Sequence, residues 1–215
     1  MNLKLIKAVG ALALGLALIG CGGSGTNNDN ENFNRVIQLG DSWVLEGTIV
    51  NDVETRNVSV DVDVVNRTLN GQTYLTLLRN RTVDGTTRIA GDLVTQGPNN
   101  HDLTIVGTVR EAEEPVDVPD ELFLPGRLIV GLQWTVVNTA DPNDDQTFEV
   151  VAEERITTPA GTFDTFKIHG TTVDGTTSDR WLSTHLGYFV KTVNTRATED
   201  GTEVETKLLT STTVP

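Results

Sequence analysis

The sequence contains one cysteine, Cys21, in 215 residues. A single thiol excludes a disulfide within the chain and a zinc site built from several cysteines. Basic residues are also scarce, because 16 lysines and arginines face 30 acidic residues and give a formal net charge of -14. A surface of this charge repels nucleic acid, so no nucleic-acid partner is expected.

A membrane-spanning run is absent as well. The apolar segment at residues 8–19 reaches only ~18 Å as a helix, whereas the hydrocarbon core of a bilayer is ~30 Å thick. Lys4 and Lys7 precede this segment, and small residues follow it. A positive start, a short apolar middle and a processing site are typical of a secretory signal, predicted here over residues 1–20.

The stretch Leu18-Ile19-Gly20-Cys21 resembles the bacterial lipobox. This resemblance implies cleavage before Cys21 and acylation of its thiol and amino group, which would hold the protein at a membrane without crossing it. The alternative is an ordinary signal that is cleaved elsewhere and leaves Cys21 unmodified. Gly22 stands where the enterobacterial signal for inner-membrane retention has aspartate, so the outer membrane is favoured. Loss of Lys4 and Lys7 changes the formal charge from -14 to -16, since residues 1–20 contain no acid.

Two regions follow the signal. Residues 21–39 are rich in glycine and asparagine and predict a lipidated flexible tether. In residues 40–215, valines at every second position from Val58 to Val64 indicate a strand with one buried face. Pairs that favour two-residue hairpin turns recur at Asn70-Gly71, Asp84-Gly85, Asp174-Gly175 and Asp200-Gly201. The sequence predicts an all-β domain, with antiparallel meander sheets that form a half-barrel or two packed similar halves.

Three landmarks recur about 90 residues apart. They are TVDGTT at 82–87 and 172–177, G-x-x-W at 40–43 and 131–134, and the turn glycines Gly71 and Gly161. This spacing predicts two repeats, 40–110 and 122–215, joined by an acidic linker at 111–121. The alternative is that Asp-Gly-Thr hairpins recur by convergence in a threonine-rich β protein.

Three segments of the second half form a familiar series: LFLPGRLIVGLQW at 122–134, ITTPAGTFDTFKI at 156–168 and RWLSTHLGYFVK at 180–191. In this series the chain resembles the TapB-type bacterial envelope lipoproteins, whose function is unknown. The resemblance implies a curved antiparallel sheet or half-barrel and brings no reaction with it. The chain departs from that pattern at Leu182, where tyrosine is frequent, and in the bulkier residues 183–186 before Gly187.

Side chains able to support catalysis are few. The spacing of His101, His169 and His185 predicts no zinc site, so each is expected to be a solvated or hydrogen-bonded imidazole. Asp61 and Asp63 share one strand face and could pair as acid and base, but their alternation with valines places them more simply on a solvated face. We therefore expect that the protein is not an enzyme and binds no cofactor.

Two binding features stand out. Asp141, Asn143 and Asp145 place oxygen atoms at alternate positions, which favours either a loose calcium site or a plain polar loop. A true EF-hand is excluded, because Gln146 and Ala152 replace its required glycine and glutamate. The three tryptophans are Trp43, Trp134 and Trp181, and each stands near the start of an apolar strand. Their rings either form the floor of a ligand-binding cleft or pack in the core.

These features favour a lipid-anchored envelope protein that acts by binding. Its expected partners are the membrane, through lipidated Cys21, and an apolar ligand such as a lipid or else a peptide or envelope protein. One alternative is a carboxylate-based hydrolase of envelope polymers, which requires two carboxyl groups in a groove. The other is a structural or adhesive surface module, which requires a filled interior.

Overall fold

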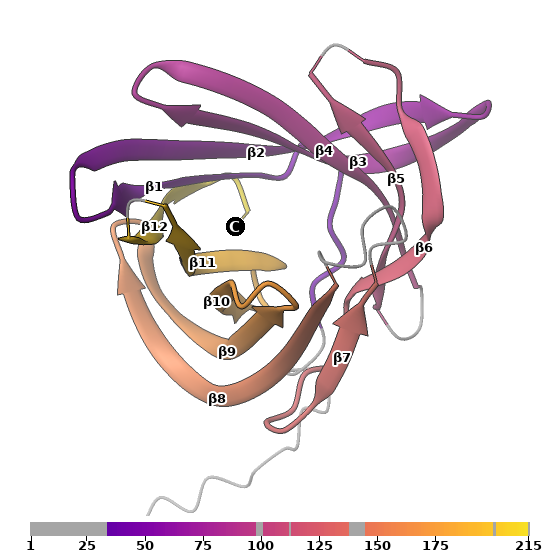
Figure 1. Cartoon of the computed structure of the whole chain (residues 1–215). Helices are drawn as coiled ribbons and strands as arrows, with labels where there is room; N and C mark the ends of the chain where they lie inside the picture. Colours follow the sequence, from indigo (N-terminus) through magenta and orange to yellow (C-terminus); the bar gives the residue numbers. More distant parts are fainter. Residues whose placement is uncertain (1–33, 98–100, 112, 138–144, 200, 215) are drawn as a thin grey trace, which may run out of the picture.

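The computed structural model describes residues 34–97, 101–111, 113–137, 145–199 and 201–214, which form twelve antiparallel strands (Figure 1). The first six are β1 (Ser42–Val50), β2 (Thr55–Leu69), β3 (Gln72–Val83), β4 (Thr86–Gln96), β5 (Leu103–Arg110) and β6 (Val116–Leu124). The second six are β7 (Gln133–Val136), β8 (Gln146–Thr158), β9 (Gly161–Thr172), β10 (Thr177–Ser183), β11 (Tyr188–Thr198) and β12 (Gly201–Thr212). No described segment is a helix long and apolar enough to cross a membrane.

All twelve strands belong to one sheet with the order β6-β5-β4-β3-β2-β1-β12-β11-β10-β9-β8-β7. Each half is a six-stranded meander, and the pairing of β1 with β12 joins the halves. The sheet curls until its edge strands β6 and β7 lie side by side (Figure 1), although no ladder joins them among the described residues. The prediction of an all-β antiparallel meander is confirmed, in its half-barrel form.

Two hairpin turns have the predicted geometry. Asn70 and Gly71, between β2 and β3, have φ angles of 52° and 80°, and Asp84 and Gly85, between β3 and β4, have 46° and 81°. Positive φ at both central residues matches the right-handed twist of the flanking strands and sets their register. Asn-Gly and Asp-Gly pairs adopt these angles at low steric cost.

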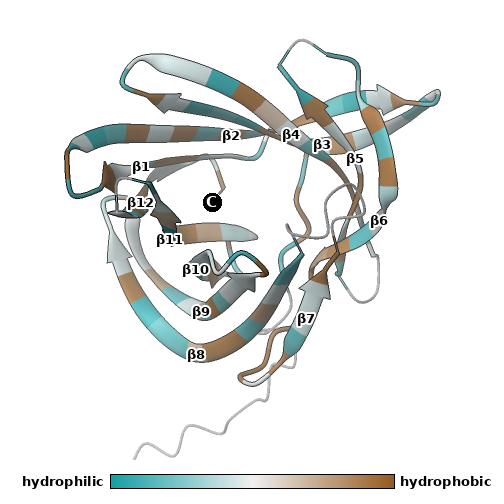
Figure 2. Cartoon of the chain, in the orientation of Figure 1, coloured by the Kyte–Doolittle hydropathy of each residue, from teal (hydrophilic) through white to brown (hydrophobic). Residues whose placement is uncertain are grey.

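The core lies on the concave face of the sheet. Val58, Val60, Val62 and Val64 are all buried, because alternate residues of a strand point to the same face. Figure 2 shows hydrophobic and hydrophilic residues alternating along several strands. The inner side chains of both halves form one core cluster, whose fully buried members include Trp43, Leu77, Leu128, Ile168 and Leu209.

The repeated sequence landmarks occupy equivalent places in the two halves. Trp43 lies in β1 and Trp134 in β7, which are the first strands of their halves. Gly71 and Gly161 lie at the connection between the second and third strands, and the two TVDGTT segments connect the third strand to the fourth. The spacing of about 90 residues therefore corresponds to one six-stranded unit.

The acidic stretch 111–121 differs from the predicted linker. From Val116 onward it belongs to β6, which pairs with β5 through Thr108 opposite Val116 and Gly107 opposite Asp117. The edge position explains the difference, because an edge strand tolerates charged residues and proline, and these obscured the strand in the sequence.

The predicted tether also ends earlier than residue 39. Asn34 and Ile37 are only 2% and 3% exposed. The backbone N–H of Asn34 donates to the carbonyl of Gly126 at 2.8 Å, and that of Arg35 donates to the carbonyl of Thr184 at 2.9 Å. The N–H of Ile37 donates to Oε1 of Gln96 in β4 at 3.0 Å. Residues 34–39 therefore contact both halves and belong to the folded domain.

Candidate functional site

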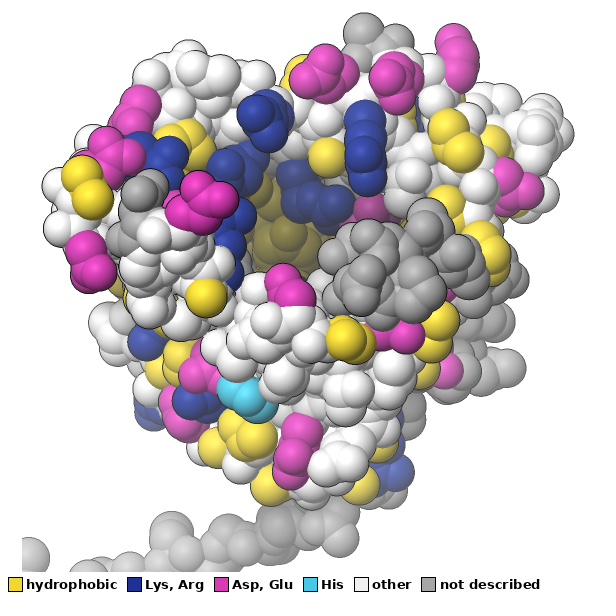
Figure 3. Space-filling model, in the orientation of Figure 1, with side chains coloured by type: hydrophobic (Ala, Val, Ile, Leu, Met, Phe, Trp, Pro, Cys, Tyr) yellow, Lys and Arg dark blue, Asp and Glu magenta, His cyan; other side chains and the backbone are white. Residues whose placement is uncertain are grey.

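The concave face of the half-barrel encloses a cavity of about 700 Å³. Figure 3 looks into it and shows lysine and arginine side chains around the hollow, with hydrophobic side chains deeper inside. Both halves contribute to the wall: Leu45, Val60, Arg79, Asp92, Ile105, Thr108, Arg110, Val118, Glu121, Phe123, Val136, Gln146, Phe148, Arg180, Tyr188, Phe189, Thr192, Asn194 and Lys207. Its size falls in the range of ~300–1,000 Å³ that is typical of ligand pockets.

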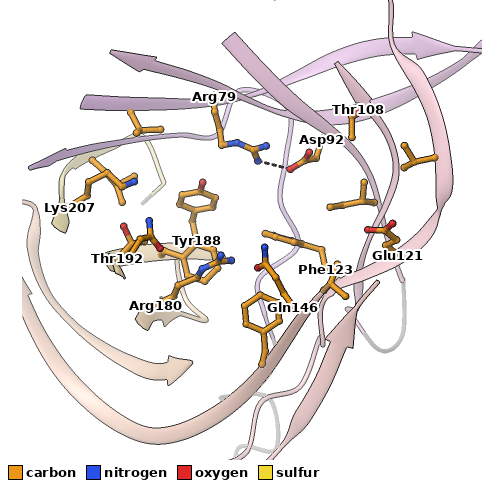
Figure 4. A pocket seen from close by; sticks show the side chains of 18 of the residues that line it. Arg79, Asp92, Thr108, Glu121, Phe123, Gln146, Arg180, Tyr188, Thr192 and Lys207 are labelled. Carbon is orange, nitrogen blue, oxygen red and sulfur yellow. Dashed lines mark hydrogen bonds and ion pairs between the residues drawn. The ribbon is translucent and has the colours of Figure 1, made fainter. Parts of the chain in front are cut away.

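Strand register places three polar side chains in one row on this wall. Arg180 of β10 stands opposite Thr192 of β11, and Thr192 stands opposite Lys207 of β12. Opposite residues of neighbouring strands share a face, and all three line the cavity. Figure 4 shows this row on one side of the cavity and Phe123 on the other.

Arg79 of β3 and Asp92 of β4 form an ion pair on an adjoining part of the wall. Nη1 of Arg79 lies 2.5 Å from Oδ2 of Asp92 (Figure 4). Burial disfavours the charge of Arg79, but its attraction to Asp92 and the hydrogen bond between them outweigh burial and raise its pKa. The charge of Arg79 is therefore largely compensated within the protein.

The guanidinium of Arg180 has a different environment. It lies against the rings of Phe148 and Phe189, 5.1 Å and 5.7 Å from their centroids. Burial lowers the pKa of Arg180, an effect that Tyr188 opposes and Arg79 reinforces, and no carboxylate contributes. Within the described ranges Arg180 makes no hydrogen bond or ion pair. Its side chain keeps partial exposure through the cavity it lines.

Lys207 already has a counter-charge, because its Nζ contacts Oε1 of Glu205. Burial lowers the pKa of Lys207, and Glu205 opposes this shift. Thr192 stands between Lys207 and Arg180 in the row, and its buried hydroxyl has no hydrogen-bond partner among the described residues. The row therefore contains one compensated cation, one unpartnered hydroxyl and one uncompensated cation.

Tyr188 lies beside the row on β11. Its ring stacks on the fully buried Trp43 with 4.7 Å between ring centroids, and burial raises the pKa of its phenol. The hydroxyl therefore stays protonated at neutral pH and is available as a hydrogen-bond donor.

A second cavity, of about 750 Å³, adjoins the first at Asn194, which lines both. It also contains arginines, but three of them are paired. Arg56 and Arg196 lie 2.8 Å and 2.7 Å from carboxylate oxygens of Glu203, and Arg81 lies 3.0 Å from Glu205. The positive charge of this second cavity is thus mostly balanced.

None of the three predicted tryptophans lines the 700 Å³ cavity, although two support it. Trp43 stacks behind Tyr188, and Trp134 stacks on Phe148 with 5.3 Å between ring centroids. Trp181 follows the cavity residue Arg180 on its strand and does not line the cavity, but it is buried and belongs to the core cluster. Its Nε1 donates to Glu154 at 2.7 Å, and its ring contacts Lys167 and Lys191.

The structure places Asp61 and Asp63 on the face of β2 opposite the buried valines, where Asp61 is exposed and Asp63 half-buried. Neither aspartate lines the cavity. Nδ1 of His169 bonds to Asp179 at 2.7 Å, Nδ1 of His101 lies 2.6 Å from the carbonyl oxygen of Asn34, and His185 is exposed. Over the described ranges, no group of three or more potential metal ligands is assembled.

Two predicted sites lie wholly or mostly outside the described residues. The lipidation site Cys21 belongs to residues 1–33, and the calcium candidates Asp141 and Asn143 belong to residues 138–144. Asp145 is described but alone defines no site. Lipidation and calcium binding stay predictions.

The cavity residues that sequence reasoning missed are mainly Arg79, Arg180, Tyr188 and Lys207. A signal for Arg79 existed, because a chain with net charge -14 places arginines at alternate positions in LLRNRTV, with the same parity as the buried Leu77. To interpret it, one must know that the side chains at these alternate positions face a cavity, and this depends on the curvature of the whole sheet.

No protein-family model and no curated protein matches the chain. Two solved structures are similar to it. One, from Parabacteroides distasonis, is described as a "putative lipoprotein"; it has 14% identity, covers 84% of this chain and 98% of its own, and has a TM-score of 0.41. The other, from Bacteroides fragilis, is described as a "putative exported protein with YmcC-like fold"; it has 12% identity, covers 84% of this chain and 99% of its own, and has a TM-score of 0.38. Neither description names a ligand or a reaction.

Proposed function

We propose that the protein is a lipid-anchored envelope protein that binds an apolar ligand in its 700 Å³ cavity without chemical conversion. The open cavity is the observation that carries this proposal, because a purely structural or adhesive module would fill its interior. Ile105, Val118, Phe123 and Val136 offer apolar contacts from β5, β6 and β7. Cavities of this size and mixed lining are suited to small molecules.

The signal segment and Cys21 support the cellular setting of the proposal. A lipidated Cys21 would hold the half-barrel at a membrane surface, with the outer membrane favoured by Gly22. A permanently anchored protein is better suited to accept or retain a ligand than to carry it between membranes.

Native mass spectrometry tests the proposal. The chain from Gly22 to Pro215 contains every described strand and would be purified from bacterial periplasm. We expect a retained small-molecule mass on the wild type and its loss in Thr108→Trp, which fills the cavity from β5. The exposed Thr157 provides the control Thr157→Trp. A bare mass that persists after incubation with envelope lipid extract would contradict the proposal.

The hydrolase alternative is favoured by one observation. Glu121 faces the same cavity as Asp92, and burial, followed by the charges of Asp145 and Asp92, raises its pKa. Asp92 is already engaged by Arg79, however, and Glu121 is only partly enclosed. This alternative predicts that the protein hydrolyses envelope glycans. It would be established if Glu121→Gln abolished hydrolysis and left ligand binding unchanged.

A further inference from the structure

The cavity holds more positive than negative charge in a protein that is strongly negative overall. Among the described residues, Arg79, Arg110, Arg180 and Lys207 line it together with two acids, Asp92 and Glu121. Since the whole chain carries a formal charge of -14, basic side chains gathered on the concave face create a local field of opposite sign. A concave site with low-dielectric walls focuses such a field.

Arg180 is the enclosed cation of this wall that the described residues leave uncompensated. Asp92 engages Arg79 and Glu205 engages Lys207, while Arg110 is exposed. Arg180 has aromatic rings and cavity space around it instead. A desolvated charge is costly unless it is paired, and its N–H groups meet no acceptor from the described chain.

Thr192 provides a second, independent indication. Its hydroxyl is buried and lacks a partner among the described residues, and register places it directly opposite Arg180. Buried polar groups are nearly always hydrogen-bonded. Two unpartnered polar groups on neighbouring strands therefore face the same space, and an oxygen atom there would serve both.

We propose, building on the proposed function, that the ligand is an anionic amphiphile whose acid group binds Arg180 and Thr192 and whose apolar tail lies against Phe123, Val118 and Val136. Guanidinium binds carboxylate and phosphate through two parallel N–H···O bonds. The hydroxyl of Thr192 donates to the same acid group. Lys207, at the other side of Thr192, and Tyr188 add positive potential and a further donor at this end of the cavity (Figure 4).

The opposite end of the cavity suits the tail. Phe123 lies across the cavity from the row that contains Arg180 (Figure 4). Val118 shares the edge strand β6 with Phe123, and Val136 lines the cavity from the other edge strand, β7. Each methylene of the tail that is buried there adds to the affinity, because apolar surface leaves water. The acid group thus selects the ligand class, while the tail supplies much of the affinity.

Displacement of 11-(dansylamino)undecanoic acid from the chain Gly22–Pro215 tests this inference. The competitors are palmitate, hexadecyl phosphate, hexadecanol and hexadecyltrimethylammonium, which separate a carboxylate from a phosphate and both from neutral and cationic heads. We expect the two anions to bind at least tenfold more tightly than hexadecanol. Arg180→Gln should weaken anion binding about ten- to hundredfold, the range of a charge-assisted hydrogen bond, and leave hexadecanol binding within about twofold.

Controls keep the outcomes distinct. Arg155→Gln removes an exposed arginine that pairs with Asp164 and should change no affinity. If Arg180→Gln fails to fold, the affinities of Thr192→Val and the comparison of palmitate with hexadecanol on the wild type decide whether the site selects an anionic head group. Equal binding of palmitate and hexadecanol would overturn the anionic class and leave the proposed function intact. No binding of any amphiphile would overturn both.

Discussion

The indole of Trp43 stacks on the phenol ring of Tyr188 with 4.7 Å between ring centroids and 20° between ring planes. Trp43 belongs to β1 and is fully buried, whereas Tyr188 begins β11 and lines the cavity. The contact therefore joins the core of the half-barrel to its cavity wall. A substitution of Trp43 in the core should therefore alter the packing of Tyr188 on the cavity wall.

Replacement of Trp43 tests this connection. Trp43→Ala should lower the free energy of unfolding by about 3–5 kcal/mol, because it removes a large buried ring and leaves a cavity. Trp43→Phe should cost less, since it keeps a ring under Tyr188 and removes an indole N–H that has no partner among the described residues. Urea unfolding of both variants measures the difference, and equal losses would contradict the stacking role.

The segment 34–39 gives a second prediction. Ile37→Ala should lower the free energy of unfolding by about 2–5 kcal/mol, as expected for truncation of a buried aliphatic side chain, because Ile37 is 3% exposed. The neighbouring Val36 is 44% exposed, so Val36→Ala should change stability by less than about 0.5 kcal/mol. A tether, by contrast, would tolerate both changes equally in thermal unfolding.

Gly47 and Gly170 lie on the inner face of the sheet, and their replacement by alanine should lower the stability of the fold by different amounts. A Cβ at Gly47 would lie 1.8 Å from the backbone oxygen of Thr206, whereas one at Gly170 would lie 2.5 Å from the ring of Phe148 and 2.6 Å from the hydroxyl of Ser178. Backbone atoms paired in a ladder cannot move aside as side chains can. We expect Gly170→Ala to cost about 1–3 kcal/mol, typical of overpacking, and Gly47→Ala to cost more.

Chemical denaturation of the two variants checks this ranking. The double variant Gly170→Ala/Ser178→Ala should recover part of the loss at Gly170, because it removes the hydroxyl that the new methyl group would meet. A reversed order, or no recovery, would contradict the steric origin of the two losses.

Stability should depend on acid pH through Glu205. Burial opposes its charge, but Lys207 and Arg81 outweigh burial and lower the pKa of Glu205 below its ordinary value. Because the folded-state pKa is depressed, the stabilisation is present above the unfolded value of about 4.3 and is lost as pH falls through the folded value. The difference in Tm between wild type and Glu205→Gln should thus be full at neutral pH and shrink below about pH 4.

Thermal unfolding from about pH 7 to pH 3 measures this dependence. Glu46→Gln is the matched control, because Glu46 is exposed on β1, and its difference from wild type should be small at every pH. A constant difference between wild type and Glu205→Gln across this range would argue that the ion pair with Lys207 does not form.

Local features of the fold were readable from the sequence. The alternating valines of β2 and the Asn70-Gly71 and Asp84-Gly85 turns depend on strand periodicity and on backbone angles, which neighbouring residues determine. The strand at Val116 was missed because edge strands need less apolar character. Burial at Asn34 and Ile37 was missed because their partners lie far away along the chain.

The candidate site depended almost entirely on tertiary structure. The antiparallel meander and the side chains that share a face of each strand could be predicted from the sequence, because both follow from local chain geometry. The curl of the twelve-stranded sheet and the pairing of β1 with β12 bring Arg180, Thr192 and Lys207 onto one cavity wall and leave Trp181 outside it. A buried charge is recognisable only once its distant neighbours are known, since its electrostatic environment comes from every strand that encloses it.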